Sequence, residues 1–138
     1  MKIALTGSTG GVGTELGLTA LAHGHSLRAL VRDPTKAERL AERGATLVTG
    51  DLEDEDALAR LVEGADVVLH TAATVGERPT PRDHARVNVE GTRAVVEAAG
   101  RAGVRRFVHL SSVAVYGMPE VGTVDESFPF VPTDEPYA

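Results

Sequence analysis

Short apolar runs alternate with longer amphipathic stretches along this chain. Five of the apolar runs have the length of strands buried on both faces, and each is bounded by glycine or polar residues. They lie at residues 2–6, 26–31, 45–50, 65–72 and 105–112. Continuous apolar strands that alternate with helices predict a parallel sheet covered by helices on both faces.

The stretches between the apolar runs carry helix signals. The predicted helices span residues 11–23, 34–43, 54–64 and 82–100. Pro34 stands at a helix start and Gly44 follows a helix end, the positions that these residues favour, and Asp33 is placed to cap the second helix. Because parallel strands are joined by right-handed crossovers, the pattern predicts an α/β fold. We expect a Rossmann-type doubly wound parallel sheet with five strands.

Composition fits one globular domain and excludes several functions. The chain has 138 residues, of which 42% are apolar, enough for one core. A net charge of −6 without a basic cluster argues against nucleic-acid or anionic-membrane partners. The absence of cysteine excludes disulfides and thiolate chemistry. No run has membrane-spanning length and no signal peptide is evident, so we expect a cytoplasmic protein.

The first strand runs directly into the glycine-rich sequence GSTGGVG. Gly7, Gly10 and Gly13 have the spacing G-x-x-G-x-x-G. Glycines here permit a tight turn after the strand, and they let backbone amides and a helix N-terminus approach a pyrophosphate. The spacing differs from G-x-G-x-x-G, so an ordinary glycine-rich loop stays an alternative. The position of the turn after the first strand of a βαβ chain favours dinucleotide binding.

The end of the second strand carries the residues that select the dinucleotide. An acid at this point favours NAD, whereas an arginine accommodates the 2′-phosphate of NADP. Arg32 could stack on adenine and contact a 2′-phosphate as a planar fork, and its alternative is a solvated surface cation. Asp33 is the competing ribose acid, but it is better placed as a helix cap. The sequence therefore favours NADP over NAD.

Other residues follow the carboxyl ends of the third and fourth strands, where the cofactor should lie. Asp51 is either an acceptor for the adenine amino group or the cap of the third helix. Ala72 and Ala73 are small enough for a cofactor to lie against the backbone. We expect Asn88 to tie neighbouring loops together and Gly91 to let another backbone approach. The expected cofactor contacts are Gly7, Thr9, Gly10, Gly11, Val12, Gly13, Arg32, Asp51, Leu52, Thr71, Ala72, Ala73 and Asn88.

The sequence predicts no metal site. His23 and His25 flank a turn glycine, and no carboxylate-rich stretch joins them. His70, at the end of the fourth apolar run, is expected to be a packed or hydrogen-bonded histidine rather than a catalytic one.

Five motifs occur in order along the chain: TGSTGGVG, GDL, HTAAT, VNVEGT and LSSVAVYG. Because of these motifs, residues 1–138 resemble the extended short-chain dehydrogenase/reductase family, also called the NAD-dependent epimerase/dehydratase family. The resemblance implies a Rossmann fold, a nicotinamide cofactor and a Ser–Tyr–Lys active site. It assigns the catalytic serine to Ser112 and the tyrosine to Tyr137, which lies 25 residues later, with Tyr116 as a disfavoured competitor. The family's lysine would fall four residues after Tyr137.

The composition changes after Gly117. Four of the seven prolines fall in the last 20 residues. We therefore expect a dinucleotide-binding Rossmann domain over 1–117 and a Pro-rich loop over 118–138 that leads into the start of the catalytic tyrosine helix. By its resemblance, the chain is expected to be the N-terminal, cofactor-binding half of a longer protein, with the C-terminal part of the family fold missing.

The resemblance implies hydride transfer between nicotinamide and an alcohol or carbonyl carbon. Tyr137 would move the proton, and Ser112 would orient the substrate oxygen. The favoured function is an NADP-preferring reductase or dehydrogenase of a small molecule. The alternatives are a nucleotide-sugar epimerase that keeps its NAD bound and a non-catalytic NAD(P)-binding regulator. We expect the 138-residue chain alone to bind dinucleotide without efficient turnover. Family members often dimerise through the helix that corresponds to 82–100 and the next one, so the resemblance implies a homodimer of the full protein.

Overall fold

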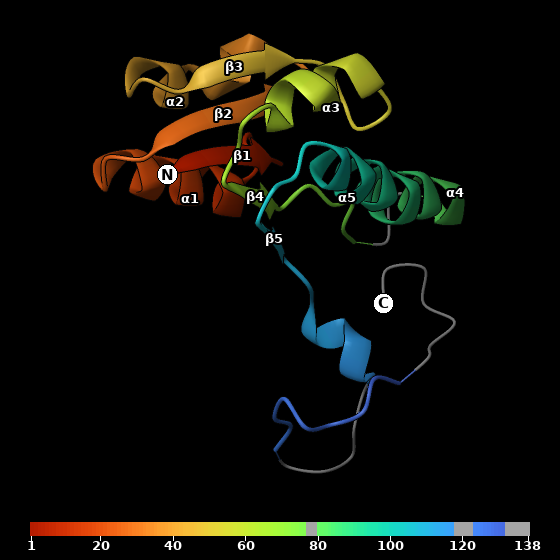
Figure 1. The fold of residues 1–138 in the computed structure, drawn as a ribbon. Helices are drawn as coiled ribbons and strands as arrows, with labels where there is room; N and C mark the ends of the chain where they lie inside the picture. Colours follow the sequence, from red (N-terminus) through yellow and green to blue (C-terminus); the bar gives the residue numbers. More distant parts are fainter. Residues whose placement is uncertain (77–79, 118–122, 132–138) are drawn as a thin grey trace.

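The computed structural model contains a five-stranded parallel sheet with helices on both faces (Figure 1). It describes residues 1–76, 80–117 and 123–131. The strands are β1 (Lys2–Thr6), β2 (Ser26–Val31), β3 (Thr46–Thr49), β4 (Val67–His70) and β5 (Arg106–His109). Their order is β3-β2-β1-β4-β5, and all neighbours are parallel. The predicted doubly wound sheet is confirmed, and the third, fourth and fifth strands are shorter than predicted.

The helices cover the sheet between successive strands. The α-helices are α1 (Gly11–Ala22), α2 (Glu38–Glu42), α3 (Glu55–Val62), α4 (Pro81–His84) and α5 (Thr92–Arg101). A π-helix, Ala85–Gly91, joins α4 to α5, so the predicted helix 82–100 is not α-helical throughout. In the described part of the chain, no helix has both the length and the apolar character needed to cross a bilayer.

The second predicted helix, 34–43, begins with a tighter turn than expected. Residues Pro34–Ala37 form a 3₁₀ helix before α2. The Lys36 N–H donates to the Asp33 carbonyl at 3.2 Å, a hydrogen bond between residues three apart. The Asp33 side chain accepts from Thr35 N at 3.1 Å, so its predicted role as a cap is confirmed.

Two apolar layers bury the two faces of the sheet. Alternate residues of β1 point to opposite faces. Ile3 and Leu5 pack in the layer that includes α1 and α2 residues, whereas Ala4 packs in the layer that includes α3 and α5 residues. Because both faces are buried, the strands carry continuous apolar runs, which is the pattern that predicted a parallel sheet.

After β5 the chain leaves the sheet (Figure 1). Val113–Tyr116 forms a 3₁₀ helix. The Tyr116 ring packs against Phe128 and Phe130 at centroid distances of 6.0 and 5.8 Å. The Val131 N–H donates to the Val115 carbonyl at 2.9 Å. These contacts join the two described parts of this segment, and the domain boundary predicted at 117/118 stays a prediction.

Candidate functional site

A cleft of about 350 Å³ opens at the carboxyl ends of the strands. The loops after β1, β3 and β4, the end of β2 and the π-helix form its walls. The lining residues are Gly7, Thr9, Gly10, Leu30, Val31, Arg32, Gly50, Asp51, Leu52, Glu53, Thr71, Ala72, Ala73, Thr74, Arg86 and Val87. The sheet order reverses between β1 and β4, and open α/β sheets bind ligands at such a switch point, outside the carboxyl ends of the strands.

The turn after β1 forms one wall of the cleft and leads into α1. Gly7 has a φ of +70°, and the Gly10 N–H donates to its carbonyl at 3.0 Å. The buried Ser8 hydroxyl donates to the Leu30 carbonyl at 2.7 Å, which fastens the turn to β2. Gly10, at the N-cap of α1, supplies no side-chain cap. The first amides of α1 therefore have no side-chain acceptor at that cap and suit an anionic ligand.

Two turn glycines lie where a side chain would collide with backbone. A Cβ atom at Gly7 would lie 2.5 Å from the Ala72 nitrogen and 2.6 Å from Thr71 Oγ1. A Cβ atom at Gly13 would meet the Gly7 carbonyl. The turn thus packs closely against itself and the loop after β4. Gly10, in contrast, has only an ordinary contact at its Cβ position, so its missing side chain leaves room on the cleft side.

Arg32 and Asp33, which follow β2, have different surroundings. Arg32 is exposed and lines the cleft, and within residues 1–76, 80–117 and 123–131 its side chain has no ion pair. Asp33 accepts from Thr35 Oγ1 at 2.7 Å. Its hydrogen bonds from the Thr35 hydroxyl and amide lower the pKa of the Asp33 carboxyl. The Asp33 carboxylate is therefore engaged by the following helix.

Asp51 does not cap the third predicted helix. Asp54 immediately precedes α3, and its Oδ1 accepts from Ala57 N at 2.8 Å. Asp51 instead accepts from Glu53 N at 2.9 Å and lines the cleft. The capping alternative for Asp51 is wrong because α3 begins at Glu55, too far along the chain for Asp51 to reach its first amides.

Asn88 holds the loop after β4 from the π-helix. Its Oδ1 accepts from Thr74 N at 2.7 Å, and its Nδ2 donates to the Thr74 carbonyl at 3.0 Å. The prediction that Asn88 ties loops together is confirmed. The prediction of a backbone approach at Gly91 is wrong. A Cβ atom at Gly91 would lie 2.6 Å from Cδ1 of Leu52, so a side chain packs there.

We expect Asn88→Ala to loosen the loop that Asn88 holds. Both backbone groups of Thr74 lose a partner, which should lower the local opening free energy by about 1–2 kcal/mol. Hydrogen exchange at the Thr74 amide measures this directly. Val89→Ala, at an exposed neighbouring position, is the control and should leave that exchange rate unchanged. Equal exchange in wild type and Asn88→Ala would contradict the clamp.

His70 is fully buried at the end of β4. Its Nδ1 lies 2.7 Å from Thr6 Oγ1 and its Nε2 lies 2.9 Å from Thr92 Oγ1. Burial, and secondly the neighbouring His109, lowers the pKa of His70 to about 4. The ring is therefore neutral at pH 7, and the prediction of a hydrogen-bonded histidine is confirmed.

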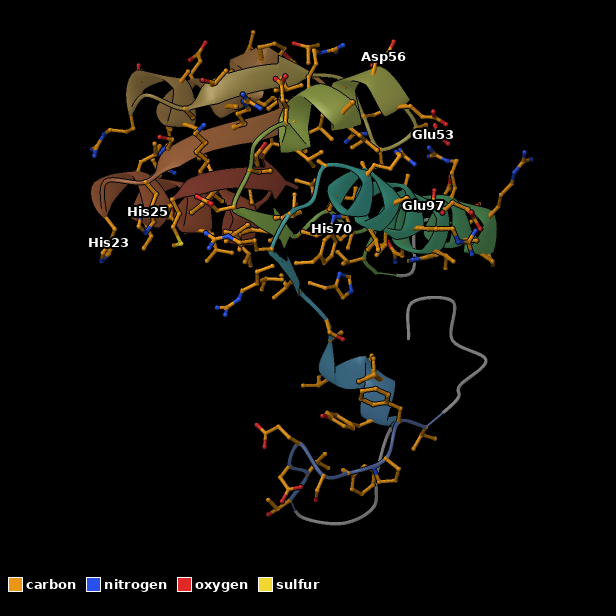
Figure 2. The ribbon with its side chains drawn as sticks, viewed as in Figure 1. His23, His25, Glu53, Asp56, His70 and Glu97 are labelled. Carbon is orange, nitrogen blue, oxygen red and sulfur yellow. The ribbon has the colours of Figure 1, made fainter. Side chains whose placement is uncertain are left out.

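The other histidines do not gather into a metal site. Figure 2 shows His70 in the interior, whereas His23 and His25 lie together at a distant edge of the molecule. Among the residues that the structure describes, no group of three or more His, Cys, Asp or Glu side chains is arranged to hold a metal ion.

Ser112 follows β5 and is half-buried. Its Oγ accepts from Ala114 N at 3.2 Å, which caps the Val113–Tyr116 helix. Ser112 is not among the residues that line the cleft. Tyr137 lies outside the described residues, so the catalytic roles of Ser112 and Tyr137 stay predictions.

The structure brings most of the predicted cofactor residues to one cleft. Gly11, Val12, Gly13 and Asn88 are the ones that do not line it. Gly13 and Asn88 instead support residues that line the cleft. Gly13 packs closely against Gly7, and Asn88 is hydrogen-bonded to Thr74. Glu53 and Arg86 also line the cleft, although they were not among the predicted cofactor residues. The position of Glu53, two residues after Asp51, could have indicated that it lines the cleft. The sequence around Arg86 contains no such indication.

A parallel sheet with a glycine turn before an open helix N-terminus, and a cleft at the switch point, defines a Rossmann-type fold. The chain belongs to the NAD dependent epimerase/dehydratase family, whose family model matches residues 3–138. The resemblance found in the sequence is confirmed.

Known proteins are similar to this chain in sequence and in fold. A 4-hydroxy-2-methyl-3-oxo-4-farnesyl-3,4-dihydroquinoline-1-oxide ketoreductase from Stigmatella aurantiaca is 39% identical over 94% of this chain and 39% of its own. A short-chain dehydrogenase/reductase superfamily protein from Agrobacterium tumefaciens, solved with bound NAD, is 38% identical with a TM-score of 0.85, over 99% of this chain and 40% of its own.

An epimerase is also similar in structure. UDP-glucose-4-epimerase from Stenotrophomonas maltophila, solved with NAD and formylated UDP-arabinopyranose, has a TM-score of 0.89 at 26% identity, over 99% of this chain and 44% of its own. The chain thus spans about two fifths of the length of the relatives that it matches.

Proposed function

We propose that the cleft binds a nicotinamide dinucleotide and that the chain supplies the cofactor site of an NAD(P)-dependent oxidoreductase acting on an alcohol or carbonyl group. The observation that carries this proposal is the Gly7–Gly13 turn. It offers backbone amides at the start of α1, with no side-chain cap and only an ordinary contact at the Cβ position of Gly10. A pyrophosphate suits such a site by charge and by hydrogen bonding. The NAD bound in similar structures supports the same ligand.

The strand order supports an assignment of the two ends of the dinucleotide. With the pyrophosphate at the Gly7–Gly13 turn, the adenosine lies toward β2 and β3, beside Arg32 and Asp51. The nicotinamide lies toward β4, where Ala72 and Ala73 leave room beside the backbone. When bound, the nicotinamide would supply hydride transfer.

Ser112 and Tyr137 complete the proposal. Ser112 would donate a hydrogen bond to the substrate oxygen, and Tyr137 would move its proton as a general acid or base. The run Val113–Val115 after Ser112 is apolar. This run contains no acidic residue, which disfavours a dehydratase within the family.

We further propose a preference for NADP. The exposed Arg32 is available at the adenosine end of the cleft, while the Asp33 carboxylate is occupied by Thr35. A guanidinium and a 2′-phosphate form a strong charge-assisted pair. The similar structures hold NAD, so the preference for NADP rests on these two side chains alone.

Titration of the 138-residue chain with NADH and NADPH tests both proposals. The chain lacks tryptophan, so the fluorescence of the reduced nicotinamide can be followed with little protein background. We expect NADPH to bind about tenfold more tightly than NADH, and Arg32→Ala to remove the difference. Arg43→Ala, which changes an exposed arginine after α2, should preserve it. Equal or tighter NADH binding would defeat the NADP preference, and no binding of either would defeat the dinucleotide site.

A nucleotide-sugar epimerase is the second candidate, supported by the likeness to UDP-glucose-4-epimerase. An epimerase of this family would keep NAD bound between turnovers, whereas a reductase exchanges it. Stoichiometric NAD released by acid from the purified protein would favour the epimerase. A non-catalytic regulator would bind dinucleotide but would retain its partner binding in Ser112→Ala.

The helical run after Thr80 is also proposed to form a homodimer. Val89 and Val96 are 52% and 47% exposed on it, and exposed apolar side chains on a helix suit an interface between two copies. Sedimentation at several protein concentrations measures the oligomeric state.

A further inference from the structure

The π-helix Ala85–Gly91 is attached to the loop after β3 at two points. Arg86 Nη1 lies 3.3 Å from Glu53 Oε2. Leu52 packs over Gly91, where a side chain would not fit. Hydrogen bonds in a π-helix join residues five apart, which brings Arg86 and Gly91 nearly into line on one face. That face meets the loop, and π-helical turns occur often at functional sites.

Glu53 and Arg86 line the same end of the cleft. Both are lining residues, together with Arg32, which directly follows β2, and Asp51 from the loop after β3. This is the end at which the proposed function places adenosine. Figure 2 shows Glu53 on the part of the loop that lies beside the helices α4 and α5. The ion pair between Glu53 and Arg86 therefore spans two different walls of the adenosine end.

The Arg86 guanidinium is held from two sides. Nη1 pairs with Glu53, and Nη2 lies 3.8 Å from Asp83 Oδ1. The three side chains are about half exposed, so the ion pairs by themselves add little stability. Their effect is to restrict the orientation of a planar group at the cleft. With two carboxylates beside it, Arg86 has its charge balanced locally, unlike Arg32.

We propose that Arg86 is a positioning residue for adenine, with its guanidinium plane stacked on the base and held there by Glu53. This inference rests on the proposed dinucleotide function. A guanidinium is planar, weakly hydrated and well suited to stacking on aromatic faces. Adenine is the part of the ligand with such a face at this end of the cleft. Arg86 thus fixes the base, whereas Arg32 selects the substituent on the ribose.

Calorimetric titration with ADP-ribose and with nicotinamide mononucleotide separates the two ends of the ligand. We expect Arg86→Ala to weaken ADP-ribose about fivefold to tenfold and to change nicotinamide mononucleotide less than about twofold. Glu53→Gln should weaken ADP-ribose about threefold because Arg86 loses its tether. Arg86→Lys keeps the charge without the plane and should not restore the affinity.

Arg93→Ala is the matched control for these variants. Arg93 pairs with Glu90 on the same helical run and does not line the cleft, so both affinities should stay unchanged. Three results would each overturn the inference: unchanged ADP-ribose affinity in Arg86→Ala, equal losses of affinity for both ligands, or full recovery of ADP-ribose affinity in Arg86→Lys. The proposed function would still stand in these cases, provided that the wild type binds ADP-ribose. Absence of binding by the wild type would overturn both. Thermal unfolding of every variant confirms that it is folded.

Discussion

Gly7→Ala is expected to remove dinucleotide binding and to lower the free energy of unfolding by about 2–5 kcal/mol. Two costs combine. Gly7 has a φ of +70°, which a residue with a Cβ atom adopts only with strain. The new Cβ atom would also lie 2.5 Å from the Ala72 nitrogen and 2.6 Å from the Thr71 carbonyl carbon. Because these neighbours are backbone atoms, the loop after β4 must move.

The same movement explains the loss of binding. Gly7, Thr71 and Ala72 all line the cleft, so displacing them disturbs the proposed pyrophosphate and nicotinamide positions together. We expect the affinity for reduced dinucleotide to fall at least about 100-fold. Urea unfolding and nicotinamide fluorescence measure the two effects separately.

Gly24→Ala is a matched control for Gly7→Ala. Gly24 has nearly the same conformation, with a φ of +74°, but no atom lies within 4 Å of its Cβ position. It should show only the conformational cost, about 1–2 kcal/mol, and should bind dinucleotide like the wild type. Equal destabilisation in the two variants, or wild-type affinity in Gly7→Ala, would show that the close packing of the turn has no energetic role.

Acidification from pH 6.5 toward pH 4 is expected to cost the wild-type protein about 3 kcal/mol of stability through His70. The ordinary pKa of histidine is 6.5, and burial lowers the pKa of His70 to about 4 in the folded chain. Between these values the unfolded chain binds a proton that the folded chain does not. Stability is therefore full above pH 6.5, falls as the pH drops toward 4, and loses nothing further from this group below 4.

Among the described residues, the other groups with shifted pKa values are carboxylates. Asp33, Asp66, Asp83 and Asp125 have lowered pKa values, so their contribution is lost only where carboxylates titrate, at the acidic end. The slope between pH 6.5 and pH 5 therefore reports mainly on His70.

His70→Phe isolates this effect. The variant loses the hydrogen bonds to Thr6 and Thr92 and should be less stable at pH 7, but its stability should be nearly flat between pH 6.5 and pH 5. His25→Gln, at a position that is not buried, should keep the wild-type slope. Urea unfolding at several pH values measures all three proteins. A wild-type slope in His70→Phe would place the acid sensitivity elsewhere.

The sequence by itself determined the fold class and the glycine turn. Both faces of a parallel sheet are buried, so each strand must be apolar along its length, and that pattern is local. The turn at Gly7–Gly13 and the cap at Asp33 are likewise local, because a φ of +70° at Gly7 and the bond that Thr35 N donates to Asp33 involve neighbours in sequence. For the same reason, most of the predicted cofactor residues that directly follow strands do line the cleft.

The tertiary structure alone decided how distant segments meet. Arg86 and Glu53 are 33 residues apart, and His70 and Thr6 are 64 apart. No periodicity or motif specifies such a pair, since each partner is positioned by the packing of a different element. Local patterns thus determined which elements form, and burial against the sheet determined which side chains share the cleft.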